Sequence, residues 1–243
     1  WWMVVLISGL SFVGYLLTQL LGQRRGTLLT AIAGGLASST AVTLTMARFA
    51  QKQQGNVLYV IAMLLASSIM FPRVLIEVFV VNRQLLASLW LPIALMLAGL
   101  ILVLLWLYRL HQRNGQPESP ELELNNPLQL STALKFGIFL ALIMLLAEAM
   151  KTWFGDAGVY TLAVVSGLMD VDAITLSLSK SAQNDLADRV AALAIVLACA
   201  SNTLLKGFIF AAIAGFRQHL RYALLMLLGI TPGVITALIQ LTL

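Results

Sequence analysis

Long apolar stretches separated by short polar connections fill this sequence of 243 residues. A helix needs about 20 mainly apolar residues to cross the hydrocarbon core of a bilayer. The pattern predicts about eight such helices, at about 1–21, 27–48, 56–81, 85–108, 130–154, 159–180, 190–215 and 222–243. The sequence therefore predicts an all-α membrane protein.

The longest polar connection falls near the middle of the chain, at 109–129, and contains Gly115 and Pro117. Glycine and proline in a polar stretch are typical of a linker. We therefore expect two halves of four transmembrane helices each, 1–108 and 130–243, on either side of it.

Two similar motifs, one in each half, indicate an internal repeat. Gly34-Gly-Leu-Ala-Ser-Ser-Thr-Ala-Val-Thr-Leu-Thr45 aligns without gaps with Ser166-Gly-Leu-Met-Asp-Val-Asp-Ala-Ile-Thr-Leu-Ser177 at an offset of 132 residues (35 to 167). Ala66-Ser-Ser and Ala200-Ser-Asn extend the similarity at an offset of 134 (66 to 200). Because each half has an even number of spans, we expect two parallel repeats related by a pseudo-two-fold axis along the membrane normal.

Asp170 and Asp172 lie near the middle of the sixth predicted helix. Each aspartate at the centre of a membrane helix costs about 2.5–3.5 kcal/mol. Positions i and i+2 point about 200° apart on a regular helix, so both carboxylates reach one site only if the helix is interrupted near Gly167. We expect segments two and six to be broken at mid-membrane, and Pro72 to kink or break segment three.

Oxygen-bearing side chains accumulate in these two motifs and in the seventh segment. Hard cations such as Mg²⁺ prefer carboxylate, carbonyl and water oxygens, whereas soft metals prefer histidine and cysteine, and neither of those lies close to the motif. The candidate ion-binding residues are Asp170, Asp172, Ser38, Ser39, Thr40, Thr43, Thr175 and Asn202. Any metal ligands would be Asp170 and Asp172.

Four further ionisable residues lie within apolar segments, namely Arg73, Glu77, Glu148 and Lys206. Such residues usually face a bundle interior or an aqueous path and are candidates for a functional charge network. Arg73 and Glu77 share a helix face at i and i+4, and Lys206 could pair with one aspartate, in a network that only fixes packing. Glu148, with Lys151 nearby, could instead lie at the membrane interface.

The sequence does not predict an enzyme or a cofactor. It has no His-Glu-x-x-His pair, no Gly-x-Ser-x-Gly elbow and no phosphate-binding glycine loop, and His111 and His219 lie in polar connections. An aspartyl intramembrane protease needs two aspartates from separate helices, whereas Asp170 and Asp172 come from one segment. The net charge of +5 comes from scattered basic residues, which argues against nucleic-acid binding. The single Cys199 excludes an internal disulfide.

These features favour a transporter or channel for a small ion, with a cation preferred, either Mg²⁺ or one coupled to protons or Na⁺. One alternative is a non-transporting membrane regulator that binds a protein or lipid partner. Another is a transporter of an anionic or organic solute held by Arg73 and Lys206. The lysines and arginines near segment ends are evenly divided between the two sides, so the orientation stays open, as does a homo-oligomer.

At the two repeated motifs, Gly34 to Thr43 and Ser166 to Thr175, the sequence resembles a bacterial polytopic membrane domain of unknown function. In that family the domain commonly follows an MgtC/SapB-type membrane domain, and the resemblance covers nearly the whole chain. It implies a multi-pass location in the bacterial inner (cytoplasmic) membrane and a loose association with magnesium homeostasis, without an established set of binding residues. Because the chain begins with Trp1, we expect an N-terminal part, such as an MgtC/SapB-type domain, to be missing from it.

Overall fold

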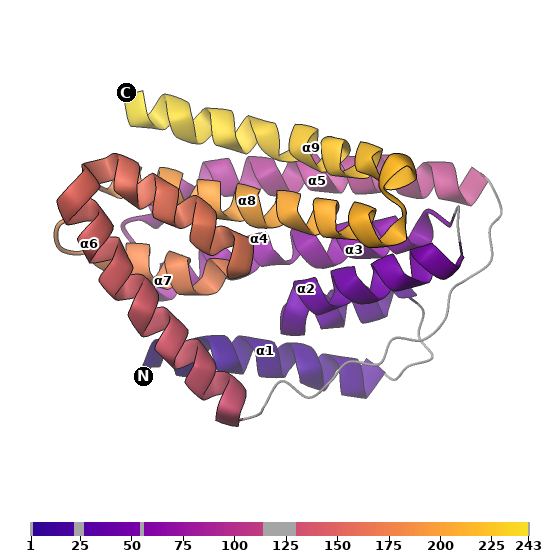
Figure 1. The fold of residues 1–243 in the computed structure, drawn as a ribbon, viewed down its shortest axis with the longest axis horizontal. Helices are drawn as coiled ribbons and strands as arrows, with labels where there is room; N and C mark the ends of the chain where they lie inside the picture. Colours follow the sequence, from indigo (N-terminus) through magenta and orange to yellow (C-terminus); the bar gives the residue numbers. More distant parts are fainter. Residues whose placement is uncertain (1, 22–26, 54–55, 114–129, 243) are drawn as a thin grey trace.

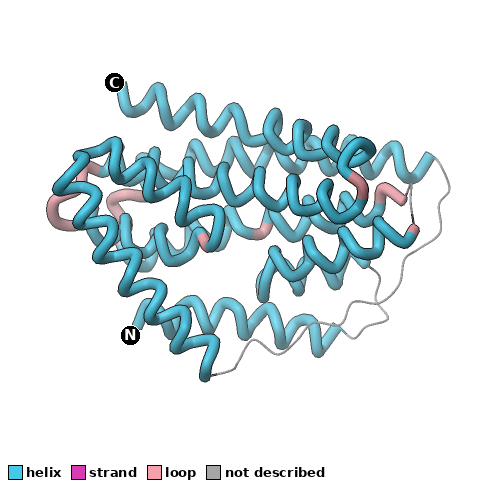
Figure 2. Tube along the Cα trace, viewed as in Figure 1, coloured by secondary structure: helices cyan, strands magenta, loops and turns pink. Residues whose placement is uncertain are grey.

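A computed structural model of the chain describes residues 2–21, 27–53, 56–113 and 130–242. Within these ranges the protein consists of helices joined by turns, and no strand occurs (Figures 1 and 2). The helices are α1 (Trp2–Leu21), α2 (Thr27–Lys52), α3 (Leu58–Ser68), α4 (Met70–Val81), α5 (Leu86–Arg113), α6 (Leu130–Met169), α7 (Val171–Ser181), α8 (Asp188–Ala214) and α9 (Phe216–Thr242). The described part of the protein is therefore all-α, as predicted.

Five helical stretches of the described residues are long and apolar enough to cross a membrane. They are Leu28–Lys52, Leu58–Val81, Leu86–Gln112, Asp188–Ala214 and Phe216–Thr242. Large apolar side chains such as Trp90, Trp106 and Leu228 are exposed on their outer faces. Contiguous apolar surface of this kind suits contact with lipid, so the protein is a membrane protein.

The centre of the bundle is formed by α3, α7 and α8. Nearly every side chain of α3 and α7 is buried, and so is most of α8. Around them pack α2, α4, α5, α6 and α9, while α1 lies against α2 at the edge (Figure 1). The most buried helices therefore include those that carry the acidic motif and the predicted Asn202 and Lys206.

Several predicted segments are divided differently in the structure. Segment three is interrupted at Ile69, between α3 and α4, as predicted from Pro72, because proline has no N–H to donate to the carbonyl of Ser68 four residues earlier. Helix α6 joins the predicted fifth segment to the first half of the sixth through a non-helical residue, Gly155, with φ 58°. The linker is predicted to begin at residue 109, but helix α5 continues to Arg113. The rest of the predicted linker, 114–129, lies outside the described residues.

Two close glycine contacts occur at equivalent places in the two halves. A Cβ at Gly35 would lie 2.8 Å from Ala66 Cα, and a Cβ at Gly167 would lie 2.7 Å from Ala198 Cα. Gly35 and Gly167 are 132 residues apart in the sequence, and so are the two alanines that they contact, Ala66 and Ala198. The two contacts thus share the offset of the opening motifs, whereas the sequence similarity of Ala66 with Ala200 has an offset of 134.

A third pair of glycines lies where α5 packs against α9. Gly99 and Gly229 face one another so closely that a Cβ at Gly99 would lie 1.9 Å from the carbonyl oxygen of Gly229. Similar sequences surround them, Ala94-Leu-Met-Leu-Ala-Gly99 and Leu224-Leu-Met-Leu-Leu-Gly229, at an offset of 130 residues (99 to 229). Small residues at such a crossing let two helix backbones approach.

Replacing Gly99 with alanine should separate α5 from α9. The added methyl group cannot fit against the backbone of Gly229, and overpacking of this kind costs about 1–3 kcal/mol. Thermal denaturation of the detergent-purified protein should therefore occur at a lower temperature. Gly9→Ala is the matched control, because nothing lies within 4 Å of that position. An equal loss in both variants would contradict the close α5–α9 crossing.

Candidate functional site

Helix α2 is interrupted at Ser38, in the middle of its length. Ser38 has extended backbone angles, φ −164° and ψ 99°. The hydroxyl of Ser38 accepts a hydrogen bond from the backbone N–H of Ala41 at 3.3 Å, as an N-cap does for a new helix. The second half of α2 thus begins at Ser39 with its own N-terminus, and Ser38 itself is exposed.

Asp170 interrupts the chain between α6 and α7 in the same manner. Its backbone is extended, φ −156° and ψ 131°, and its carboxylate accepts a hydrogen bond from the backbone N–H of Asp172 at 3.0 Å. Ser38 and Asp170 are 132 residues apart, the offset of the repeated motifs. The sequence predicts interruptions in both segments, and the structure has them at these equivalent positions.

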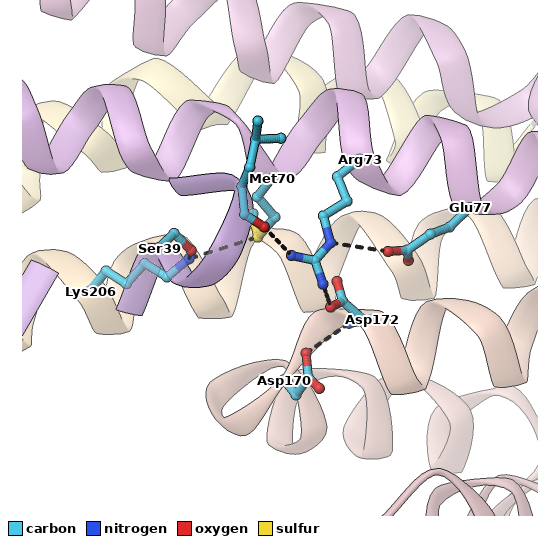
Figure 3. A network of polar contacts seen from close by, with 8 residues as sticks. Ser39, Met70, Arg73, Glu77, Asp170, Asp172 and Lys206 are labelled. Carbon is cyan, nitrogen blue, oxygen red and sulfur yellow. Dashed lines mark hydrogen bonds and ion pairs between the residues drawn. The ribbon is translucent and has the colours of Figure 1, made fainter. Parts of the chain in front are cut away.

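Arg73 of α4 connects both interruptions (Figure 3). Its guanidinium donates to the carbonyl oxygen of Leu36 at 3.2 Å, just before the break in α2, and Nε lies 3.3 Å from Glu77 Oε1. A third contact is an ion pair with the carboxylate of Asp172, in the first turn of α7. Arg73 thereby joins the first half of the chain to the second.

Lys206 of α8, in the second half of the chain, contacts residues of the first half. Its ammonium donates to the hydroxyl of Ser39 at 2.7 Å and lies 4.0 Å from the sulfur of Met70. The side chain is only 2% exposed. No carboxylate oxygen of the described residues lies within ion-pair distance of it, since the two ion pairs found there both belong to Arg73.

Asn202 supports the second interruption. Its side-chain amide donates to the carbonyl oxygen of Gly167 at 2.7 Å. A helix that stops leaves its last carbonyls without intrahelical partners, and buried carbonyls of this kind need another donor. Asn202 in the second half therefore acts on the backbone as Arg73 does at Leu36 in the first half.

The remaining predicted residues lie at different places around these contacts. Thr43 donates to the carbonyl of Ser39 at 2.9 Å, and Thr40 is exposed. Thr175 is fully buried, and its hydroxyl has no hydrogen-bond partner among the described residues, nor has Oε2 of Glu77. Glu148 is exposed on α6 and makes no ion pair with a described residue.

We call Arg73, Glu77, Asp170, Asp172 and Lys206 the charge network. It contains three carboxyl groups and two basic groups, so it carries one excess negative charge when every group is ionised. Asp170 and Asp172 come from one short stretch, but the first caps α7 and the second binds Arg73. Among the described residues, no three histidine, cysteine, aspartate or glutamate side chains are arranged to hold a metal ion. Such a network can accept a proton or exchange ion-pair partners.

Sequence reasoning missed three groups that contact Arg73, Lys206 or Asn202 at this site. The carbonyls of Leu36 and Gly167 accept from Arg73 and Asn202, and the sulfur of Met70 lies beside Lys206. The carbonyls carry a detectable signal, because each lies two or three residues before a polar residue that interrupts a helix. Met70 carries none, since a methionine in an apolar segment is ordinarily a packing residue.

Comparisons with known proteins agree with the resemblance to a domain of unknown function. Residues 5–214 match the family described as "Domain of unknown function (DUF4010)". A protein of Aquifex aeolicus (strain VF5) described as uncharacterized is 35% identical over 181 residues, which cover 74% of this chain and 78% of that protein. No solved structure matches the chain. The association with an MgtC/SapB-type domain stays a prediction. The family match spans well over half of the residues, and the chain accordingly belongs to the DUF4010 family.

Proposed function

We propose that this protein is a multi-pass transporter of the bacterial inner membrane that moves a small cation, a proton in the first instance, through the charge network. The observation that carries the proposal is the position of this network at two interrupted helices. Non-helical backbone at membrane depth is tolerated where it is buried in protein or lines an aqueous path, and transporters commonly place their ion sites there.

The excess negative charge of the network supports a cationic substrate. Glu77 is fully buried and Asp172 is 8% exposed, and an uncompensated buried carboxylate is costly. One proton or one monovalent cation would neutralise the group. A divalent ion at both aspartates would compete with Arg73 for the charge of Asp172 and with the helix cap for Asp170, so protons fit the observed contacts better than Mg²⁺.

The contacts between halves suggest how a proton would drive a conformational change. Arg73 and Lys206 both reach across to the other half, at Asp172 and Ser39. Protonation of Asp172 would weaken its ion pair with Arg73, while Glu77 and the Leu36 carbonyl would keep the guanidinium in place. The two halves could then rock against each other about a pseudo-two-fold axis near Gly99 and Gly229, as parallel repeats do.

A direct test uses proteoliposomes that contain the purified protein. We expect a pH gradient to be dissipated faster than in empty liposomes, and parallel assays with Mg²⁺, Na⁺ and K⁺ gradients would identify a coupled ion. Absence of flux under every gradient, together with a protein partner that co-purifies, would overturn the proposal and favour a membrane regulator.

One observation favours a second candidate, a transporter of small anions. The Lys206 ammonium has no carboxylate partner among the described residues and lies at the N-terminus of the second half of α2. Helix N-termini attract anions. Saturable uptake of a small organic anion that does not depend on the pH gradient would support this candidate over proton transport.

A further inference from the structure

A cavity of about 220 Å³ opens beside the turn between α8 and α9. It is much larger than a single water molecule requires. Its polar lining residues are Asn56, Arg217, Gln218, His219, Arg221 and Tyr222. Among the described residues the lining contains two arginines and no acidic residue, so the cavity is suited to an anion.

Two helix N-termini meet at this cavity. Val57 and Val60 belong to the start of α3, and Arg217, Gln218 and His219 belong to the first turn of α9. Helix N-termini carry partial positive charge and bind phosphate groups in many proteins. The two helix ends therefore add to the positive potential of the arginines.

Several of the lining side chains are already held in position. Arg221 donates to the hydroxyl of Tyr222 at 2.9 Å and lies 4.8 Å from the centre of the same ring. His219 is 7% exposed, and its Nδ1 lies 3.0 Å from the carbonyl oxygen of Gly215. Fixed side chains lose little conformational freedom when a ligand binds.

The cavity lies where apolar helices end. Two of the stretches long enough to cross a membrane begin here, Leu58–Val81 and Phe216–Thr242, and Asp188–Ala214 ends here. Phe216, next to Arg217, is 51% exposed. An exposed aromatic ring beside a basic residue at a helix end is typical of the headgroup level of a membrane.

We propose that this cavity binds a phosphate-bearing anion, held by Arg217, Arg221 and the N-termini of α3 and α9. Phospholipid headgroups and soluble phosphates share this chemistry. The site is separate from the charge network, so the proposal stands or fails independently of proton transport.

The test measures binding to the purified full chain with two probes. Native mass spectrometry would compare retention of phosphatidylglycerol with retention of phosphatidylcholine, and calorimetric titration would measure binding of inorganic phosphate. We expect Arg217→Gln/Arg221→Gln to weaken the binding of the preferred probe by about tenfold, because each arginine near a phosphate contributes severalfold to affinity. Arg217→Gln alone, at an exposed position, should weaken it by about threefold and replaces the double variant if that one does not fold.

Arg109→Gln is the matched control, since it removes one positive charge from an exposed position of α5 outside the cavity lining. It should bind either probe as the unmodified protein does. Variant-sensitive retention of phosphatidylglycerol identifies a lipid headgroup, and variant-sensitive phosphate binding without lipid preference identifies a soluble ligand. Binding that is absent for both probes, or equally weakened by Arg109→Gln, overturns the proposal.

Discussion

Replacing Arg73 with glutamine is expected to destabilise the protein by about 3–5 kcal/mol, because it leaves the buried carboxylates of Glu77 and Asp172 without their cationic partner. Glutamine also cannot span from Leu36 to both acids as the guanidinium does. A loss of this size should lower the midpoint of thermal denaturation in detergent by about 6–20 °C.

Two variants make this expectation specific. Arg83→Gln removes a charge that lies exposed over the ring of Phe79, at 5.2 Å, and should change stability by less than about 0.5 kcal/mol. Adding Glu77→Gln and Asp172→Asn to Arg73→Gln should restore much of the lost stability, since no uncompensated buried charge remains. Equal melting of Arg73→Gln and Arg83→Gln would show that the guanidinium does not compensate buried acids.

Replacing Lys206 with methionine should also destabilise the protein, but by less than Arg73→Gln does. The ammonium is almost completely buried and bonds to the neutral hydroxyl of Ser39. Its removal raises the excess negative charge of the network from one to two, and the hydrogen bond to Ser39, worth about 1 kcal/mol, is lost. We expect a loss of about 1–3 kcal/mol, because no direct ion pair of Lys206 is broken. Flux should also fall, by at least about tenfold, because the variant removes one of the five groups of the charge network through which protons are proposed to move.

The control for this variant is Lys180→Met, at an exposed position near the end of α7. It should leave both the melting temperature and the flux close to those of the unmodified protein. If Lys206→Met melted as far below the unmodified protein as Arg73→Gln does, the ammonium would belong to a stabilising ion-pair network. That result would contradict the separate role given to it.

Features that depend on local sequence could be predicted. The hydrophobic pattern predicts the helices, the i,i+2 spacing of the two aspartates after Gly167 predicts the interruption found at Asp170, and the shared motif extends that prediction to segment two, which is interrupted at Ser38. The pair of Arg73 and Glu77 also follows from i,i+4 spacing on one helix. Each of these needs only neighbouring residues.

Contacts between distant residues could not be predicted from one sequence. Arg73 binds Asp172, 99 residues later, because α4 packs against α7. Pairing of Lys206 with an aspartate is one alternative that the sequence leaves open, and in the structure Lys206 bonds to Ser39, 167 residues earlier. Helix periodicity gives the face on which a side chain lies, and the packing of the whole bundle decides which other helix that face meets.

Whether the carboxylates of Asp170 and Asp172 face the same site could not be predicted from the sequence either. From spacing alone, Asp170 and Asp172 could hold one ion together only through an unwound stretch. The helix does stop at Asp170, but its carboxylate turns to the N–H of Asp172, which leaves Asp172 for Arg73. A capping role competes with ion binding at this position, and sequence alone does not decide between them.

The central claim is that the charge network moves protons. The most direct measurement is the initial rate of proton uptake by proteoliposomes that contain equal amounts of unmodified protein, Asp170→Asn or Glu148→Gln. Asparagine caps a helix as well as aspartate does, so Asp170→Asn removes the charge and preserves the start of α7. We predict that Asp170→Asn lowers the rate at least about tenfold, a loss typical of a missing proton-transfer group, while Glu148→Gln, at an exposed position, does not lower it. Equal rates for all three proteins would contradict the assignment.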